Sequence, residues 1–257
     1  MCEELTNNLV FLVFCPIFAV NMANNYFQFR QFTVRQERCA MKVGTDGTLL
    51  GAWAQAPHGA CRILDIGTGS GLIALMMAQR FPEASVVGID IDPEAVSQAR
   101  ENAMESLFSS RISILEENVV SMESAELFDA IVCNPPYFVD SLTCPDAQRT
   151  TARHTVSLTY EALIKTAFRL LKTEGFFSVV IPVESRSVIE AQAVLQGFLM
   201  TRICQIRTTP RKQPKRFLIE FRKTTDYMID ISDGIIEIEP NVRSPWYQQL
   251  THEFYIK

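Results

Sequence analysis

Arg62-Ile-Leu-Asp-Ile-Gly-Thr-Gly-Ser-Gly71, followed by Leu72-Ile-Ala-Leu-Met-Met-Ala-Gln-Arg80, decides the fold of this chain. The apolar half of the first stretch predicts a short buried strand, and the second stretch predicts a helix. Glycines at 67, 69 and 71 allow a tight turn between them and let a ligand approach the backbone at the helix N-terminus. The spacing is G-x-G-x-G, which differs from the G-x-G-x-x-G of dinucleotide-binding proteins.

A second strand, Val86-Val-Gly-Ile-Asp90, ends in an acid about twenty residues after the glycine turn. An acid at this place in an open α/β sheet can bind the two hydroxyls of a ribose. Asp92 stands directly before Pro93, a pair typical of the start of a helix. We therefore expect the ribose contact at Asp90 and a helix cap at Asp92.

The remaining chain alternates strand and helix patterns, which predicts an α/β fold with a doubly wound, mostly parallel, seven-stranded sheet. A helix is expected over residues 48–56. The last two strands, 199–207 and 217–222, are joined by a short connection and should form an antiparallel hairpin. The expected domain boundaries are an N-terminal extension 1–21, a segment 22–60 packing on the site, a main domain 61–223 and a C-terminal extension 224–257.

Residues 134–137 read Asn-Pro-Pro-Tyr and follow the apolar stretch 128–133. Two prolines cannot continue a central strand, so the chain must turn at Asn134, at the edge where open α/β sheets bind ligands. The Asn134 side-chain oxygen and the Pro135 carbonyl can together accept both hydrogens of one planar NH₂ group. Tyr137 can then stack on the ring that carries this group.

The glycine turn and the strand-end acid resemble the S-adenosylmethionine site of class I methyltransferases. This resemblance implies a Rossmann-like methyltransferase fold and S-adenosylmethionine as the cofactor. Many relatives carry an Asp after the third strand, at the place where this chain has Asn118, whose amide can still accept from the cofactor's adenine. The implied cofactor-binding residues are Lys42, Thr45, Asp65, Gly67, Thr68, Gly69, Gly71, Asp90, Asn118 and Asn134.

A closer resemblance covers roughly residues 26–223 and is carried most specifically by Lys42-Val-Gly-Thr-Asp-Gly47 together with Asn134–Tyr137. These segments are similar to the bacterial tRNA(Val) adenine-N6 methyltransferases, which modify the adenine beside the anticodon. The resemblance implies that Asn134, Pro135, Pro136 and Tyr137 are the catalytic residues. Three alternatives stay open: a guanine-N2 rRNA methyltransferase, a glutamine-amide protein methyltransferase, and a non-catalytic RNA-binding module.

The net charge of −5 argues against a broad surface that coats nucleic acid, so an RNA contact should be a local patch. Cations gather around the predicted hairpin and on the loop after residue 137. The expected tRNA contacts are Arg149, Arg153, Arg207, Arg211, Lys212, Lys215 and Arg216.

Cysteine and histidine usage agrees with a cytoplasmic protein. The seven cysteines are scattered, form no C-x-x-C pair and have no zinc-like spacing with the three histidines, so we expect free thiols and no metal site. The apolar run 9–20 is shorter than the roughly 20 residues of a membrane span. We expect no membrane association, a working protein that begins at Met22, and a monomer.

Overall fold

The computed structural model describes residues 25–135, 158–226 and 228–256. The expected extension 1–21, the second half of the 134–137 tetrad (Pro136 and Tyr137) and the loop cations Arg149 and Arg153 lie outside these residues.

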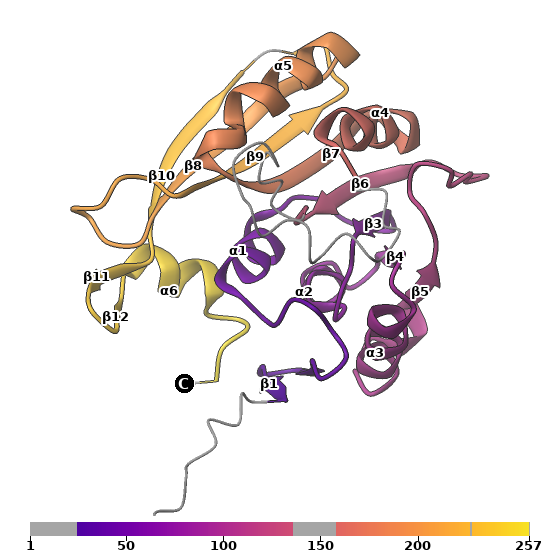
Figure 1. Cartoon of the computed structure of the whole chain (residues 1–257), viewed down its shortest axis with the longest axis horizontal. Helices are drawn as coiled ribbons and strands as arrows, with labels where there is room; N and C mark the ends of the chain where they lie inside the picture. The colour runs from indigo at the N-terminus through magenta and orange to yellow at the C-terminus, as the bar shows by residue number, and fades with distance from the viewer. Residues whose placement is uncertain (1–24, 136–157, 227, 257) are drawn as a thin grey trace, which may run out of the picture.

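A mixed sheet with helices on both faces forms the body of the molecule (Figure 1). Its strands are β3 (Arg62–Ile66), β4 (Ser85–Asp90), β5 (Ile112–Glu116), β6 (Phe128–Cys133), β7 (Leu171–Pro182), β8 (Leu199–Arg207), β9 (Arg216–Arg222) and β10 (Asp230–Ile235). Short hairpins are β1 (Tyr26–Gln28) with β2 (Thr33–Arg35), and β11 (Glu237–Glu239) with β12 (Val242–Arg243). The helices are α1 (Thr45–Trp53), α2 (Leu72–Arg80), α3 (Pro93–Met104), α4 (Tyr160–Leu170), α5 (Arg186–Gln196) and α6 (Pro245–Thr251), with 3-10 turns at Ser109–Arg111 and Val183–Ser185.

The strand order is β10-β8-β9-β7-β6-β3-β4-β5. Only β9 runs against its neighbours β7 and β8, which confirms the mostly parallel sheet and its antiparallel closing pair. The seven expected strands all take part, and β10 adds an eighth by pairing parallel to β8 at the edge. The chain winds outwards in opposite directions from β3 and β6, and doubly wound sheets bind ligands at the carboxyl ends of strands at such a switch.

Successive residues of the central strands enter two different cores. Ala130 and Val132 of β6 face the cluster that contains α1, α2 and α3, whereas Ile131 and Cys133 face the cluster that contains α4 and α5. This period of two is what a strand buried on both faces requires.

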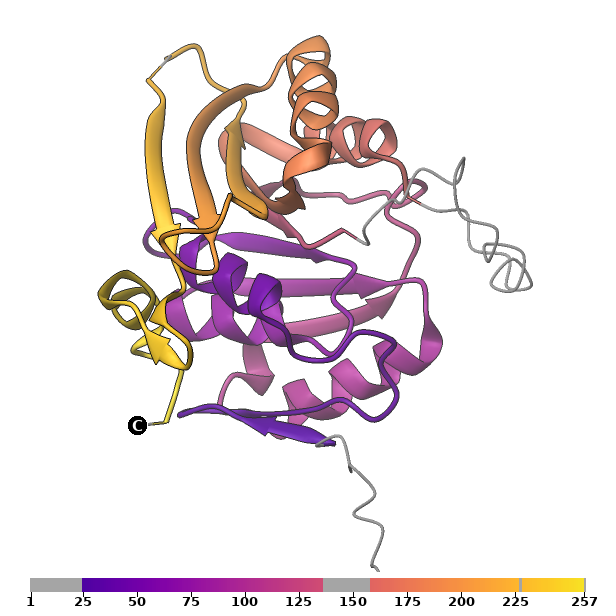
Figure 2. The same ribbon diagram turned by 60° about the vertical axis from the view of Figure 1, so that its left-hand side comes forward.

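Residues 27–32, near the start of the described chain, pack against Phe254 and Tyr255 near its end (Figure 2). Both segments also belong to the core that contains α1, α2 and α3. The Arg30 amide donates to the Phe254 carbonyl at 2.8 Å. The Tyr255 ring lies 5.9 Å from Phe27 and 5.8 Å from Phe29, centroid to centroid. The segments before residue 61 and after residue 223 therefore share the core of the main domain, while the proposed boundaries themselves stay a prediction.

Candidate active site

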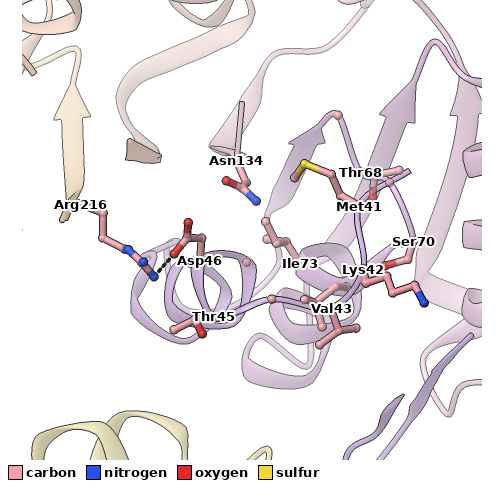
Figure 3. A pocket seen from close by; sticks show the side chains of 15 residues that line it. Met41, Lys42, Val43, Thr45, Asp46, Thr68, Ser70, Ile73, Asn134 and Arg216 are labelled. Atoms are coloured by element: carbon pink, nitrogen blue, oxygen red, sulfur yellow. Dashed lines mark hydrogen bonds and ion pairs between the residues drawn. The ribbon is translucent and has the colours of Figure 1, made fainter. Parts of the chain in front are cut away.

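A pocket of about 290 Å³ lies at the carboxyl ends of β3 and β6, the neighbouring strands between which the winding direction of the chain changes. Four separate parts of the chain meet in it: the segment 41–47, the glycine loop after β3 with the start of α2, Asn134 after β6, and Arg216 at the start of β9 (Figure 3). Its lining residues are Met41, Lys42, Val43, Gly44, Thr45, Asp46, Gly47, Gly67, Thr68, Gly69, Ser70, Leu72, Ile73, Asn134 and Arg216. Of the residues expected at the cofactor, this brings together Lys42, Thr45, Gly67, Thr68, Gly69 and Asn134.

The glycine loop presents bare backbone to the pocket. Gly67 and Gly69 have φ of 69° and 54°, a region that favours glycine, and a Cβ built on either would meet nothing within 4 Å. The space beside both residues is therefore open, and a side chain there would fill part of it. Such a cradle fits a ligand that approaches the backbone closely.

Two neighbouring elements hold this loop in place. Asp90, at the end of β4, accepts from the Gly69 amide at 2.9 Å and from the Asp92 amide at 3.0 Å. The Thr68 amide donates to the Ile89 carbonyl at 2.9 Å. Asp90 thus lies beside the loop at the carboxyl edge, as expected for a ribose-binding acid. Asp92 accepts from the Glu94 amide at 3.0 Å and caps α3, with Pro93 at its first position, which confirms the predicted cap.

Asn102 of α3 ties the loop to the N-terminal part of the chain. Its side-chain NH₂ donates to the Ser70 and Arg35 carbonyls, both at 2.8 Å, and its oxygen accepts from the Arg35 amide at 2.9 Å. Gln36 then fixes the next segment, because its side-chain oxygen accepts from the Val43 amide at 2.7 Å. Sequence reasoning missed both residues, since no local pattern marks an amide whose partners come from distant segments.

Asp65 is completely buried below the loop. One carboxylate oxygen accepts from the Thr68 hydroxyl at 2.7 Å and from the Ala74 amide at 3.1 Å. The other oxygen, Oδ1, has no hydrogen-bond partner among the described residues. Burial raises the pKa of Asp65 to about 7, although its two hydrogen bonds favour the charged form. An unpartnered buried carboxylate oxygen next to a ligand cradle fits a cationic group, so the residues present suit a cofactor that carries an ammonium.

Asn118, Lys42 and Thr45 occupy more exposed places. The Asn118 side-chain oxygen accepts from the Val120 amide at 3.0 Å and so forms the turn after β5. Asn118 does not line the pocket, and its contact with a cofactor adenine stays a prediction. Figure 3 shows the Lys42 side chain pointing away from Asn134.

Asn134 follows the last residue of β6 and is half-buried, while Pro135 is buried. β6 ends at Cys133, as two following prolines require. The Asn134 side chain lines the same pocket as the glycine loop, which is the arrangement needed to bring an acceptor close to a bound cofactor.

The expected RNA-binding cations divide into two groups. Arg211, Lys212 and Lys215 are exposed on the loop between β8 and β9, at the carboxyl edge that also carries Asn134. Arg207 pairs with Asp233 of β10, and Arg216 pairs with Asp46 inside the pocket. The sequence did not predict that Arg216 and Asp46 meet there.

Within the described part of the chain, no group of three or more His, Cys, Asp or Glu side chains could hold a metal ion. No helix among residues 25–135, 158–226 and 228–256 has the length and apolar character needed to cross a membrane.

Comparison with known proteins decides the family. Residues 47–202 match the family described as "Methyltransferase small domain". A tRNA1(Val) (adenine(37)-N6)-methyltransferase of Bacteroides thetaiotaomicron is 48% identical over 236 residues, which cover 91% of this chain and 99% of that protein. This chain belongs to the tRNA1(Val) adenine-37 N6-methyltransferase family. A relative of the same name from Vibrio parahaemolyticus is 39% identical over 237 residues, covering 90% of this chain and 95% of its own.

Solved structures support a methyltransferase fold for this chain. A predicted O-methyltransferase from Agrobacterium tumefaciens superposes with a TM-score of 0.66 at 25% identity, over 81% of this chain and 96% of its own. A [4+2]-cyclase shares the fold with a TM-score of 0.54 at 17% identity, covering 74% of this chain and 90% of its own. Because a cyclase also has this fold, the fold alone does not determine the reaction, which depends on the residues of the site. Membership in this family implies S-adenosylmethionine as the methyl donor, and the open glycine cradle and the unpartnered Asp65 oxygen fit it.

Cofactor affinity should depend on pH through Asp65. Since its pKa lies at about 7 in the free protein, the carboxylate that can accept an ammonium is mostly protonated at lower pH. Affinity for S-adenosylhomocysteine should rise about 10-fold from about pH 6 to about pH 8, as the charged fraction grows. Calorimetric titration of the wild type and of Asp65→Asn, which cannot titrate, measures this. Equal slopes against pH in the two proteins would contradict the assignment.

Stability of the cofactor-free protein gives an independent check. The raised pKa means that the folded state keeps a proton which the unfolded chain loses above its ordinary pKa. The free energy of unfolding should therefore fall as pH rises towards about 7 and then level off. Asp65→Asn should remove this part of the pH dependence.

Proposed function

We propose that this protein transfers a methyl group from S-adenosylmethionine to N6 of adenine 37, beside the anticodon, in tRNA(Val), and that it acts in the cytoplasm. The observation that carries the proposal is the shared pocket: Asn134 lies together with the glycine loop and the segment 41–47. The names of relatives that align over nearly their whole length support the substrate.

The chain's own groups supply orientation. An aromatic amine is a poor nucleophile because its lone pair is delocalised into the ring. The Asn134 oxygen and the Pro135 carbonyl would accept hydrogen bonds from the two N–H groups of the target amine and so direct its lone pair towards the methyl group. Asp65, the glycine loop and Asp90 would hold the cofactor, which when bound supplies an electrophilic methyl on a sulfonium. Most of the rate gain would then come from positioning and electrostatics. Tyr137 would stack on the target base.

An anticodon-loop adenine suits this site because it is close to single-stranded. Extruding such a base costs less than extruding one from a duplex. The exposed cations on the β8–β9 loop lie at the same edge of the sheet as Asn134, where they could bind the phosphates that flank the target.

The test is methyl transfer to defined substrates. Purified protein, labelled S-adenosylmethionine and unmodified tRNA(Val) should yield N6-methyladenosine by mass spectrometry of the digested RNA. The same tRNA with guanine at position 37 should accept no methyl group. Transfer to rRNA guanine, or to a protein glutamine, would replace the proposal with one of those activities. No transfer to any of the three would favour a non-catalytic RNA-binding role.

Removing the exposed cations of the β8–β9 loop should weaken tRNA binding without changing cofactor affinity. A triple variant with Arg211, Lys212 and Lys215 changed to Gln removes the positive charges that would neutralise up to three phosphates. The slope of log affinity against log salt should become shallower by about one for each phosphate that is no longer neutralised. Filter binding across a salt series measures it. Arg35→Gln, an exposed cation that pairs with Glu105, is the control and should keep the wild-type slope. An unchanged slope in the triple variant would make this loop a solvated turn.

A further inference from the structure

An ion pair in the wall of the pocket, between Arg216 and Asp46, holds neither the cofactor nor the target amine in the proposed reaction. The Arg216 guanidinium donates to the Asp46 carboxylate, although the two residues lie 170 positions apart in the sequence. Their side chains are only 19% and 17% exposed. The pair joins the first turn of α1 to the first residue of β9.

Strand direction explains why Arg216 reaches the active site. β9 runs antiparallel to β7, so its first residue pairs with Pro182, the last residue of β7. Arg216 therefore stands at the edge of the sheet where the parallel strands end. Figure 3 shows the Asp46 side chain directed towards Arg216, and Asn134 lines the same pocket.

Stability alone does not account for this pair. Taking two charges out of water costs free energy that their attraction often only balances. Burial raises the pKa of Asp46 even though Arg216 pulls it down, so the cost of desolvation is the larger effect on this carboxylate. The fold thus places a costly negative charge in the pocket that also contains Asn134, the residue expected to hold the target amine.

We propose that Asp46 is a further catalytic residue, whose carboxylate stabilises the positive charge that develops on the target amine, and that Arg216 positions it. The inference rests on the proposed function. In the step, the amine nitrogen bonds to the methyl carbon while the methyl–sulfur bond breaks. The positive charge moves from sulfur to nitrogen and disappears when one N–H proton leaves to water. A carboxylate fixed near the nitrogen favours this charge, and preorganised groups of this kind lower the barrier.

This role separates Arg216 from the exposed cations of the β8–β9 loop. Its guanidinium is turned into the pocket and engaged with Asp46, whereas Arg211, Lys212 and Lys215 are exposed. Arg216 should therefore act on the rate of methyl transfer through Asp46 and contribute little to the salt dependence of tRNA binding.

The test compares Asp46→Asn, Arg216→Gln and Arg216→Lys with the wild type. Asp46→Asn keeps the shape and an acceptor oxygen but removes the charge. The single-turnover rate at saturating cofactor and tRNA should fall on the order of 10-fold. This is a smaller loss than expected for Asn134→Ala, because Asp46→Asn keeps an acceptor oxygen. The rate of Arg216→Gln should fall by a similar factor. Arg216→Lys keeps a cation for Asp46, so its rate should lie between those of Arg216→Gln and the wild type. Glu190→Gln is the matched control, because Glu190 is also a partly buried carboxylate paired with an arginine but lies on α5.

Two further measurements exclude other roles. Calorimetry should give wild-type cofactor affinity for Asp46→Asn, and the salt slope of tRNA binding should be unchanged in Arg216→Gln. Weaker cofactor binding in Asp46→Asn would move this residue to the cofactor site, and a shallower salt slope would return Arg216 to the RNA contacts; either result overturns the inference. A wild-type rate in Asp46→Asn also overturns it, and leaves the proposed function intact as long as the wild type methylates tRNA. Should Asp46→Asn fail to fold, the two Arg216 variants decide.

Discussion

Replacing Asn134 with alanine should lower the single-turnover rate of methyl transfer by about 10²- to 10³-fold, the effect seen when one preorganised polar group is removed from a reacting centre. Asn134 stands at the end of β6 and lines the pocket together with the glycine loop. Without its oxygen, the target amine keeps one acceptor and its lone pair is no longer directed. The protein should still fold, because β6 ends at Cys133 and the Asn134 side chain belongs to neither core.

The control variant for this prediction is Asn134→Asp, and the control measurement is the cofactor affinity of both variants. A carboxylate still accepts a hydrogen bond, so Asn134→Asp should retain more activity than Asn134→Ala, at the cost of desolvating an extra charge. Both variants should bind cofactor nearly as well as the wild type, since Asp65, the loop and Asp90 come from β3 and β4. A near-wild-type rate for Asn134→Ala would mean that the tetrad is only a turn, and the amino-methyltransferase mechanism would fall with it.

Local sequence rules predicted the elements whose ends are set by their own residues. The helix 72–80 was predicted with the observed bounds, because Gly71, with φ of 81°, precedes it and an apolar pattern fills it. The helix expected at 48–56 instead spans Thr45–Trp53. Its Gly51 disfavours a helix by propensity, yet a Cβ there would lie 2.7 Å from Met76 Sδ. Close packing of α1 on α2 therefore requires a residue that local propensity counts against the helix.

The eighth strand shows a second limit of sequence reasoning. β10 reads Asp-Ile-Ser-Asp-Gly-Ile, and most of it is exposed or half-buried, so its pattern does not predict a buried strand. It forms because the free edge of β8 offers backbone partners and because Gly234 leaves room for the Trp246 ring, which a Cβ would approach to 2.4 Å. Both reasons depend on tertiary contacts.

The same distinction holds in the active site. The places of Asp90 and Asn134 at the carboxyl edge of the sheet could be predicted, because Asp90 ends a strand and Asn134 directly follows one. Arg216 looked like one more cation of a charged loop, since its place in the pocket follows from the antiparallel direction of β9. Asp46 stood inside a segment that carried the family resemblance, and only the fold brings its side chain to Arg216.

Asp90→Ala should weaken cofactor binding by about 10²-fold or more. The variant can no longer form two charge-assisted hydrogen bonds to the ribose hydroxyls, each contributing roughly 1.5–3 kcal/mol. The structure adds a second reason, because Asp90 also accepts from the Gly69 amide at 2.9 Å and so holds the cradle on which the cofactor would lie. Calorimetry with S-adenosylhomocysteine measures the effect.

Asp92→Ala is the matched control, because it removes a carboxylate two residues away that caps α3. It should cost about 1 kcal/mol of stability and leave the cofactor affinity unchanged. If Asp90→Ala binds the cofactor as tightly as Asp92→Ala does, the ribose lies elsewhere. In that case the acid at the end of β4 serves only to fix the loop, and Asp65 and the glycine backbone remain to explain how the cofactor is held.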